Sequence, residues 1–272
     1  MNKILLRSLT GAVFISIILI PIFFSDRFLA VVLGFFMVIG LIEFYNLFER
    51  GNSANVSWET SLYYGVFTYG VSSLVLFDVL PNEALVILIP MLFSLFLIEL
   101  WRKKKNPLIN LSVFVFGIIY VTVPFILMVH ITVMDNNTFP LLAGMFILTW
   151  VNDTFAYLSG LIAGKTKLFE RISPKKTSEG TIGGAVFTII AAIIIGYVFD
   201  NDHLIFWILA SLIIIPCAIL GDLMESLFKR SMNVKDTGNI MPGHGGILDR
   251  FDGTFFVVPF FLMCWVLYNY FT

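Results

Sequence analysis

Residues 204–228 read LIFWILASLIIIPCAILGDLMESLF, an apolar run that carries two acidic residues, Asp222 and Glu225, near its end. A helix needs about 20 predominantly apolar residues to cross roughly 30 Å of hydrocarbon, and this run is long enough. A carboxylate at the centre of a bilayer costs about 2.5–3.5 kcal/mol on insertion scales, so acids in such a run mark functional positions. The run therefore predicts a membrane-spanning helix with a polar task at one end.

Similar apolar runs recur along the whole chain. Of its 272 residues, 58% are hydrophobic and only 13% are charged, whereas about a quarter of the residues of a soluble domain are charged. We expect an all-α polytopic membrane protein, a single integral membrane domain over residues 1–272, with N-terminal spans in 1–134 and catalytic spans in 139–272. About nine spans are predicted, at 5–24, 28–48, 62–80, 84–101, 111–134, 139–163, 181–199, 204–228 and 254–271. No small-residue cleavage site follows the first run, so we expect it to be a retained span rather than a signal peptide.

The basic residues predict the orientation, because Lys and Arg accumulate in the cytoplasmic loops of membrane proteins. With the N-terminus placed in the cytoplasm, all of the 17 Lys and Arg residues except Arg27 fall on the cytoplasmic side. An odd number of spans then puts the C-terminus outside. Cys217 and Cys264 both lie inside predicted spans, where we expect small apolar side chains rather than a disulfide or a metal site.

Several isolated polar residues interrupt the runs. Glu43, Asp78 and Glu99 lie near predicted span ends, so we interpret them mainly as side chains that reach the membrane interface. His130 is interpreted as a hydrogen-bonded packing residue.

The first dense polar stretch is WVNDTFAYLSGLIAGKTKLFERISPKKTSEGTIGG, residues 150–184. Lysines supply point charges, and glycines at a helix start let backbone N–H groups approach an anion. The stretch predicts a phosphate site, and an equally good interpretation is a basic cytoplasmic loop before a helix packed through glycine. The candidate substrate-binding residues are Asp153, Lys175, Lys176 and Thr177.

The second stretch is GDLMESLFKRSMNVKDTGNIMPGHGGILDRFDG, residues 221–253. On a helix, Asp222, Glu225 and Ser226 share one face, and Lys229 continues it one turn later. PGHGG predicts a turn, after which DRFD returns two more carboxylates beside a guanidinium. Mg²⁺ takes one or two carboxylates and completes its shell with water and substrate phosphates, so the pattern indicates metal-assisted phosphoryl chemistry.

The same stretch resembles the signature of the phosphatidate cytidylyltransferase (CDP-diacylglycerol synthase) family. Its positions are filled by Ser226, Lys229, Arg230, Lys235, Asp236, Gly238, Pro242, His244, Gly245, Gly246, Asp249, Arg250 and Asp252. Met241 stands where the pattern usually has Leu, Ile or Phe, which is a conservative change. SPKKTSEGTIGG and the upstream ND-x-x-AY also match the family.

The resemblance implies a reaction in which CTP and phosphatidic acid give CDP-diacylglycerol and pyrophosphate, on the cytoplasmic face of a bacterial inner membrane. It implies Mg²⁺, and a second cation besides, held by Asp222 and Asp249 with support from Asp252 and Glu225. The implied catalytic residues are Asp222, Asp249, Lys229, Arg230, Lys235, Arg250 and His244, and Ser226, Gly245 and Gly246 join the substrate-binding residues above. We expect His244 to contact phosphate rather than to act as a base, because a lipid phosphate is already ionised at neutral pH.

Other functions stay open at this point. A secondary transporter also carries acids at mid-membrane and helices broken by glycine, but its polar groups would be spread over more spans. A related CTP-dependent enzyme acting on another lipid, such as a polyprenol kinase or an archaeal-lipid cytidylyltransferase, would share the chemistry. The bilayer is the expected partner, nucleic acid is not, and a homodimer is one arrangement compatible with the sequence.

Overall fold

The structure is a computed structural model that describes residues 3–51, 54–135, 139–234, 236–238 and 245–272. Nearly all of its regular structure is helical, and each predicted apolar run overlaps a helical segment. The expected all-α class is confirmed. The chain divides into two compact units, residues 1–133 with 231–250, and residues 134–230 with 251–272.

The first unit surrounds α2 (Asp26–Arg50), which begins at Ser25, whose side chain accepts a hydrogen bond from the N–H of Phe28. This helix packs against α1 (Lys3–Phe24), α3 (Trp58–Leu76), α5 (Pro107–Gly117) and α6 (Val123–Val133). A short π-helix, η2 (Ile118–Thr122), joins α5 to α6, and a 3₁₀ turn, η1 (Asn82–Ile87), precedes α4 (Leu88–Arg102). The buried face of α2 carries Leu33, Met37, Leu41, Phe44 and Tyr45. The hydroxyl of Tyr45 donates a 2.8 Å hydrogen bond to the carbonyl of Phe114, so α2 is fixed to α5 by a polar contact as well as by packing.

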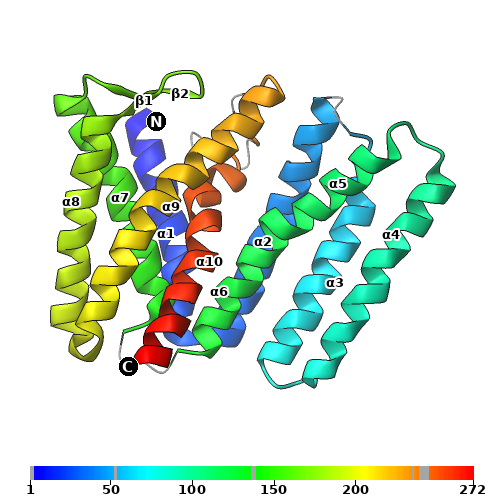
Figure 1. The fold of residues 1–272 in the computed structure, drawn as a ribbon, viewed down its shortest axis with the longest axis horizontal. Helices are drawn as coiled ribbons and strands as arrows, with labels where there is room; N and C mark the ends of the chain where they lie inside the picture. Colours follow the sequence, from blue (N-terminus) through cyan, green and yellow to red (C-terminus); the bar gives the residue numbers. More distant parts are fainter. Residues whose placement is uncertain (1–2, 52–53, 136–138, 235, 239–244) are drawn as a thin grey trace. The chain divides into compact units, whose positions relative to one another are not determined.

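The second unit contains α7 (Leu141–Ala163), α8 (Ser178–Ile194), α9 (Leu204–Ser231) and most of α10 (Leu248–Phe271). A π-helix, η3 (Ile195–Phe199), and a 3₁₀ turn, η4 (Asn201–His203), connect α8 to α9. α7 and α8 lie side by side (Figure 1), and β1 (Lys167–Phe169) pairs antiparallel with β2 (Ser173–Thr177) in the loop between them. A Cβ atom at Gly184 would lie only 2.8 Å from the carbonyl of Asn152, so glycine allows the two helices to approach closely.

Seven helical segments of the described residues are long and apolar enough to cross a membrane. They are Asp26–Glu49, Asn82–Arg102, Pro107–Val133, Leu141–Ala163, Ser178–Phe199, Asn201–Ser231 and Leu248–Phe271, and the part of α1 from Leu9 to Phe24 is a shorter apolar stretch. α3 is not among them, since it is rich in Ser, Thr and Tyr. The chain is an integral membrane protein, while the count of about nine spans and the cytoplasmic N-terminus stay predictions. Cys217 and Cys264 are buried thiols inside α9 and α10.

Candidate functional site

The second unit carries three acids on different helices, Asp153 on α7, Asp222 on α9 and Asp252 on α10, that are near enough to influence one another electrostatically. The charge of Asp252 on α10 interacts electrostatically with Asp222 on α9, Asp153 on α7 and the cation of Lys229. Glycine makes this possible, because a Cβ atom at Gly221 would lie 2.7 Å from the carbonyl of Asp252. α9 and α10 therefore approach each other closely beside the two carboxylates.

Cationic side chains accompany these acids. The ammonium of Lys176, on β2, forms an ion pair with Oδ2 of Asp222 at 2.5 Å, and Ser226 donates a 3.3 Å hydrogen bond to Oδ1. One turn later on α9, Lys229 pairs with the buried Glu225 at 3.3 Å. The predicted shared face of α9 is thus present, and a residue predicted to bind phosphate contacts a residue predicted to bind metal.

The hairpin loop before α8 combines exposed and structural residues. Lys175 is exposed, whereas Thr177 is buried and caps α8 by accepting the N–H of Gly180 at 3.2 Å. The carboxylate of Glu179 accepts the N–H groups of Lys165 and Thr166 at 3.0 and 3.1 Å. Lys175 is therefore the predicted phosphate ligand that this loop presents to solvent, and the hydroxyl of Thr177 serves the helix start.

Residues 231–250, called the signature segment below, lie between the two helices α9 and α10 and include the first residues of α10. They belong to the first unit. Oδ2 of Asp249 accepts hydrogen bonds from the N–H of Gly246 at 2.8 Å and from the N–H and hydroxyl of Thr237 at 3.0 Å each. Gly245 has a φ of +88°, a left-handed conformation that glycine adopts without strain. The glycines thus form a turn that closes on Asp249.

Sequence reasoning missed the role of Glu43, which was expected to reach the membrane interface. This interpretation was wrong, because its side chain is buried and accepts the N–H of Leu248 at 2.9 Å. The only signal in the sequence was an acid inside an apolar run. Asp78, by contrast, is exposed in the turn after α3, as an interfacial residue should be.

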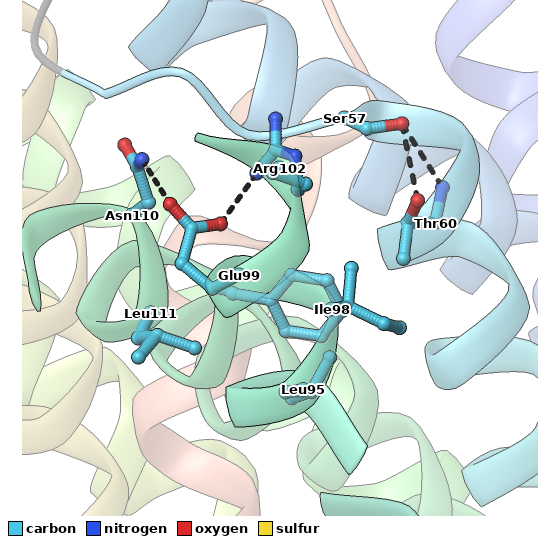
Figure 2. A pocket seen from close by; sticks show the side chains of 9 residues that line it. Ser57, Thr60, Leu95, Ile98, Glu99, Arg102, Asn110 and Leu111 are labelled. Carbon is cyan, nitrogen blue, oxygen red and sulfur yellow. Dashed lines mark hydrogen bonds and ion pairs between the residues drawn. The ribbon is translucent and has the colours of Figure 1, made fainter. Parts of the chain in front are cut away.

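Glu99 is also buried, but in a separate polar cluster of the first unit. Figure 2 shows its carboxylate between Asn110, which donates at 2.6 Å, and Arg102, which forms an ion pair at 2.8 Å. Arg102 and Asn110 also hydrogen-bond to Asn55, so the cluster joins the segment before α3 to the end of α4 and the start of α5. These contacts satisfy the buried charge of Glu99 and have a structural role.

The remaining predicted residues divide into two groups. Arg230 is exposed at the end of α9, and Arg250 is half-buried in the first turn of α10. Lys235 and His244 lie outside the described residues, so their predicted roles stay predictions.

The carboxylates of the second unit are of the chemical type that binds Mg²⁺. Within the part of the chain that the structure describes, no three His, Cys, Asp or Glu residues form a metal-binding group. Mg²⁺ needs only one or two protein carboxylates. In the structure, the Lys176 ammonium forms an ion pair with Asp222, so this carboxylate is already in contact with a positive charge. A site with few protein ligands, completed by substrate phosphates, fits these residues.

Comparison with known proteins gives the class. A family model described as "Cytidylyltransferase family" matches residues 5–268, so the chain belongs to this family of nucleotidyltransferases, and the resemblance seen in the sequence is confirmed.

Individual relatives carry a more specific name. A phosphatidate cytidylyltransferase of Staphylococcus haemolyticus (strain JCSC1435) is 39% identical over 183 residues, which are 67% of this chain and 69% of that protein. A phosphatidate cytidylyltransferase of Staphylococcus aureus (strain COL) is 50% identical over 116 residues, 42% of this chain and 44% of that protein.

Proposed function

We propose that the chain transfers CMP from CTP to phosphatidic acid in a metal-dependent reaction, giving CDP-diacylglycerol and pyrophosphate. The observation that carries the proposal is the cluster of Asp222, Asp252 and Lys176 at the ends of apolar helices. It combines acids for a metal with cations for phosphates, in a chain whose relatives are named phosphatidate cytidylyltransferase. The cluster belongs at the cytoplasmic face of an inner membrane, where the nucleotide is found.

In this reaction an oxygen of the lipid phosphate attacks the α-phosphorus of CTP. A new P–O bond forms, the bond between the α-phosphorus and the bridging oxygen breaks, and pyrophosphate leaves with the electron pair. No base is required, since the attacking phosphate is already ionised. The difficulty is the repulsion between two anions, which positioned cations reduce.

The basic residues of the chain divide this task. Lys175 and Arg230 are exposed, and we assign them contacts to the phosphates of an incoming nucleotide. Lys176 and Lys229 form ion pairs with carboxylates, which orient their ammonium groups. Arg250, Lys235 and His244 complete the proposed phosphate contacts. Asp222 and Asp249 would hold Mg²⁺, with Asp252 and Glu225 in support, and a bound divalent ion would neutralise charge on the transferring phosphoryl group.

The test is direct. Purified protein in detergent is incubated with CTP labelled in its α-phosphate, phosphatidic acid and Mg²⁺, and the lipid and aqueous phases are counted. We expect label in a lipid that co-migrates with CDP-diacylglycerol, and its loss when phosphatidic acid is omitted or the metal is chelated. Label that stays in water while a polyprenol becomes phosphorylated from CTP would replace the proposal with a lipid kinase.

A further inference from the structure

Glu43 occupies an unusual place for a carboxylate in a membrane protein. It lies in the apolar helix α2, its side chain is 4% exposed, and its Oε2 accepts the N–H of Leu248 at 2.9 Å and the hydroxyl of Thr237 at 3.4 Å. Burial of a carboxylate is costly unless hydrogen bonds compensate it, and these bonds come from the signature segment. α2 therefore binds that segment through a buried acid.

The contacts of Glu43 continue to Asp249. The hydroxyl of Thr237 lies 3.0 Å from Oδ2 of Asp249 and 3.4 Å from Oε2 of Glu43. The Thr237 hydroxyl carries one proton, so it donates to one of the two carboxylates at a time, and it lies within hydrogen-bond distance of both. The N–H of Leu248, which binds Glu43, precedes Asp249 directly in the chain. Two routes thus connect Glu43 to the position of Asp249.

Two signature glycines pack against the same carboxylate. A Cβ atom added at Gly238 would collide with Oε1 of Glu43, and one added at Gly246 would collide with Oε2. Gly246 also donates its N–H to Asp249 at 2.8 Å. The lack of side chains at these positions therefore has a specific purpose, which is to let the segment close around Glu43.

We propose that Glu43 is a positioning residue, which holds Thr237 and Leu248, and through them Asp249, in the conformation that the reaction requires. It does not touch substrate in this scheme and acts through Thr237 and the backbone of Leu248. The inference rests on the proposed function, in which Asp249 is a metal ligand. It assigns a task to the N-terminal half of the chain, which the signature itself does not cover.

The kinetic experiment compares Glu43→Ala and Glu43→Gln with the full-length parent protein. Removal of a residue that orients a metal ligand typically costs about 10–100-fold in metal affinity or activity. We expect Glu43→Ala to lower kcat by this factor and to raise the Mg²⁺ concentration for half-maximal activity, with little change in the KM for phosphatidate. Glu43→Gln should be milder, because the amide oxygen still accepts the N–H of Leu248. Glu99→Gln, another buried acid of the same unit, is the matched control and should keep the parent's Mg²⁺ dependence.

A second measurement does not depend on turnover. Ile247 is 2% exposed in the same segment, so Ile247→Cys, in a protein with Cys217→Ala and Cys264→Ala, places a protected thiol there. We expect Glu43→Ala to accelerate maleimide labelling of this thiol by at least about 10-fold, in keeping with the loss of hydrogen bonds to a charged group. Glu99→Gln should leave the labelling rate unchanged.

The two measurements separate the possible failures. Unchanged Mg²⁺ dependence and unchanged labelling in both Glu43 variants would overturn the inference, as would a kcat loss of equal size in Glu99→Gln. If the parent protein makes no CDP-diacylglycerol, the proposed function fails, and the labelling rates still decide whether Glu43 holds the segment. If Glu43→Ala does not fold, Glu43→Gln carries both measurements, and parent-like values in that variant count against the inference.

Discussion

Replacing Asp222 by Asn should separate catalysis from stability. The change keeps the size of the side chain and removes the charge that pairs with Lys176 at 2.5 Å. These side chains remain 26% and 34% exposed, so solvent screens the pair and its loss should cost less than about 1 kcal/mol of unfolding free energy. Loss of a group that stabilises charge in a transition state typically lowers kcat by about 10²–10³-fold. We therefore expect a well-folded protein with very little activity.

The assay is CDP-diacylglycerol formation at several Mg²⁺ concentrations, with thermal unfolding measured on the same preparations. Raising Mg²⁺ or supplying Mn²⁺ should restore part of the activity if the defect lies in metal affinity. Asp26→Asn is the control, since Asp26 is exposed in the first turn of α2, and it should leave activity unchanged. Near-normal turnover of Asp222→Asn at low Mg²⁺ would refute its role as a metal ligand. A large loss of stability would show instead that the ion pair holds the fold.

Three further outcomes are expected. Lys175→Ala, at an exposed position, should raise the KM for CTP or phosphatidate without impairing insertion or purification, and unchanged kinetics would reduce this loop to a basic cytoplasmic loop. Gly144→Val should lower the midpoint of thermal unfolding, because a Cβ atom there collides with the ring of Trp207 and overpacking costs about 1–3 kcal/mol; an unchanged midpoint would contradict the packing. Alkaline phosphatase fused after Thr272 should be active, because the C-terminus is predicted to lie outside the cytoplasm. A cytoplasmic reporter that is active at the same position would instead indicate an even number of spans.

The helical class was predictable because apolar runs of membrane length have few alternative structures. The starts of the helices were less so. The structure begins α10 at Leu248, whereas the apolar run predicted a start at residue 254. The difference arises because the first two turns of the helix contain the polar residues Asp249, Arg250 and Asp252, which hydropathy excludes from a span. Acidic residues near a helix N-terminus are favourable to the helix dipole, which hydropathy does not register. The β1/β2 hairpin was hidden in the same way, since its short strands lie in a polar loop.

The site was predictable where its residues are neighbours on one helix, as with Asp222, Ser226 and the pair of Glu225 and Lys229. Contacts between distant segments could not be obtained in this way. Nothing in the sequence pairs Lys176 with Asp222, or Glu43 with Thr237, because such pairs depend on how the helices pack. Gly246 both forms part of the turn and packs against the buried Glu43, and this second contact could be recognised only from the structure.

The assignment of residues 231–250 to the first unit, while most of α9 and α10 belongs to the second, limits how relatives can be recombined. A chimera that exchanges residues 1–133 alone would present a foreign α2 to a resident signature segment. Its success should depend on whether the incoming helix carries an acid at the position of Glu43, opposite Gly238 and Gly246. Exchange of residues 1–133 together with 231–250 keeps these partners of common descent, and it is the crossover design that should yield functional hybrids.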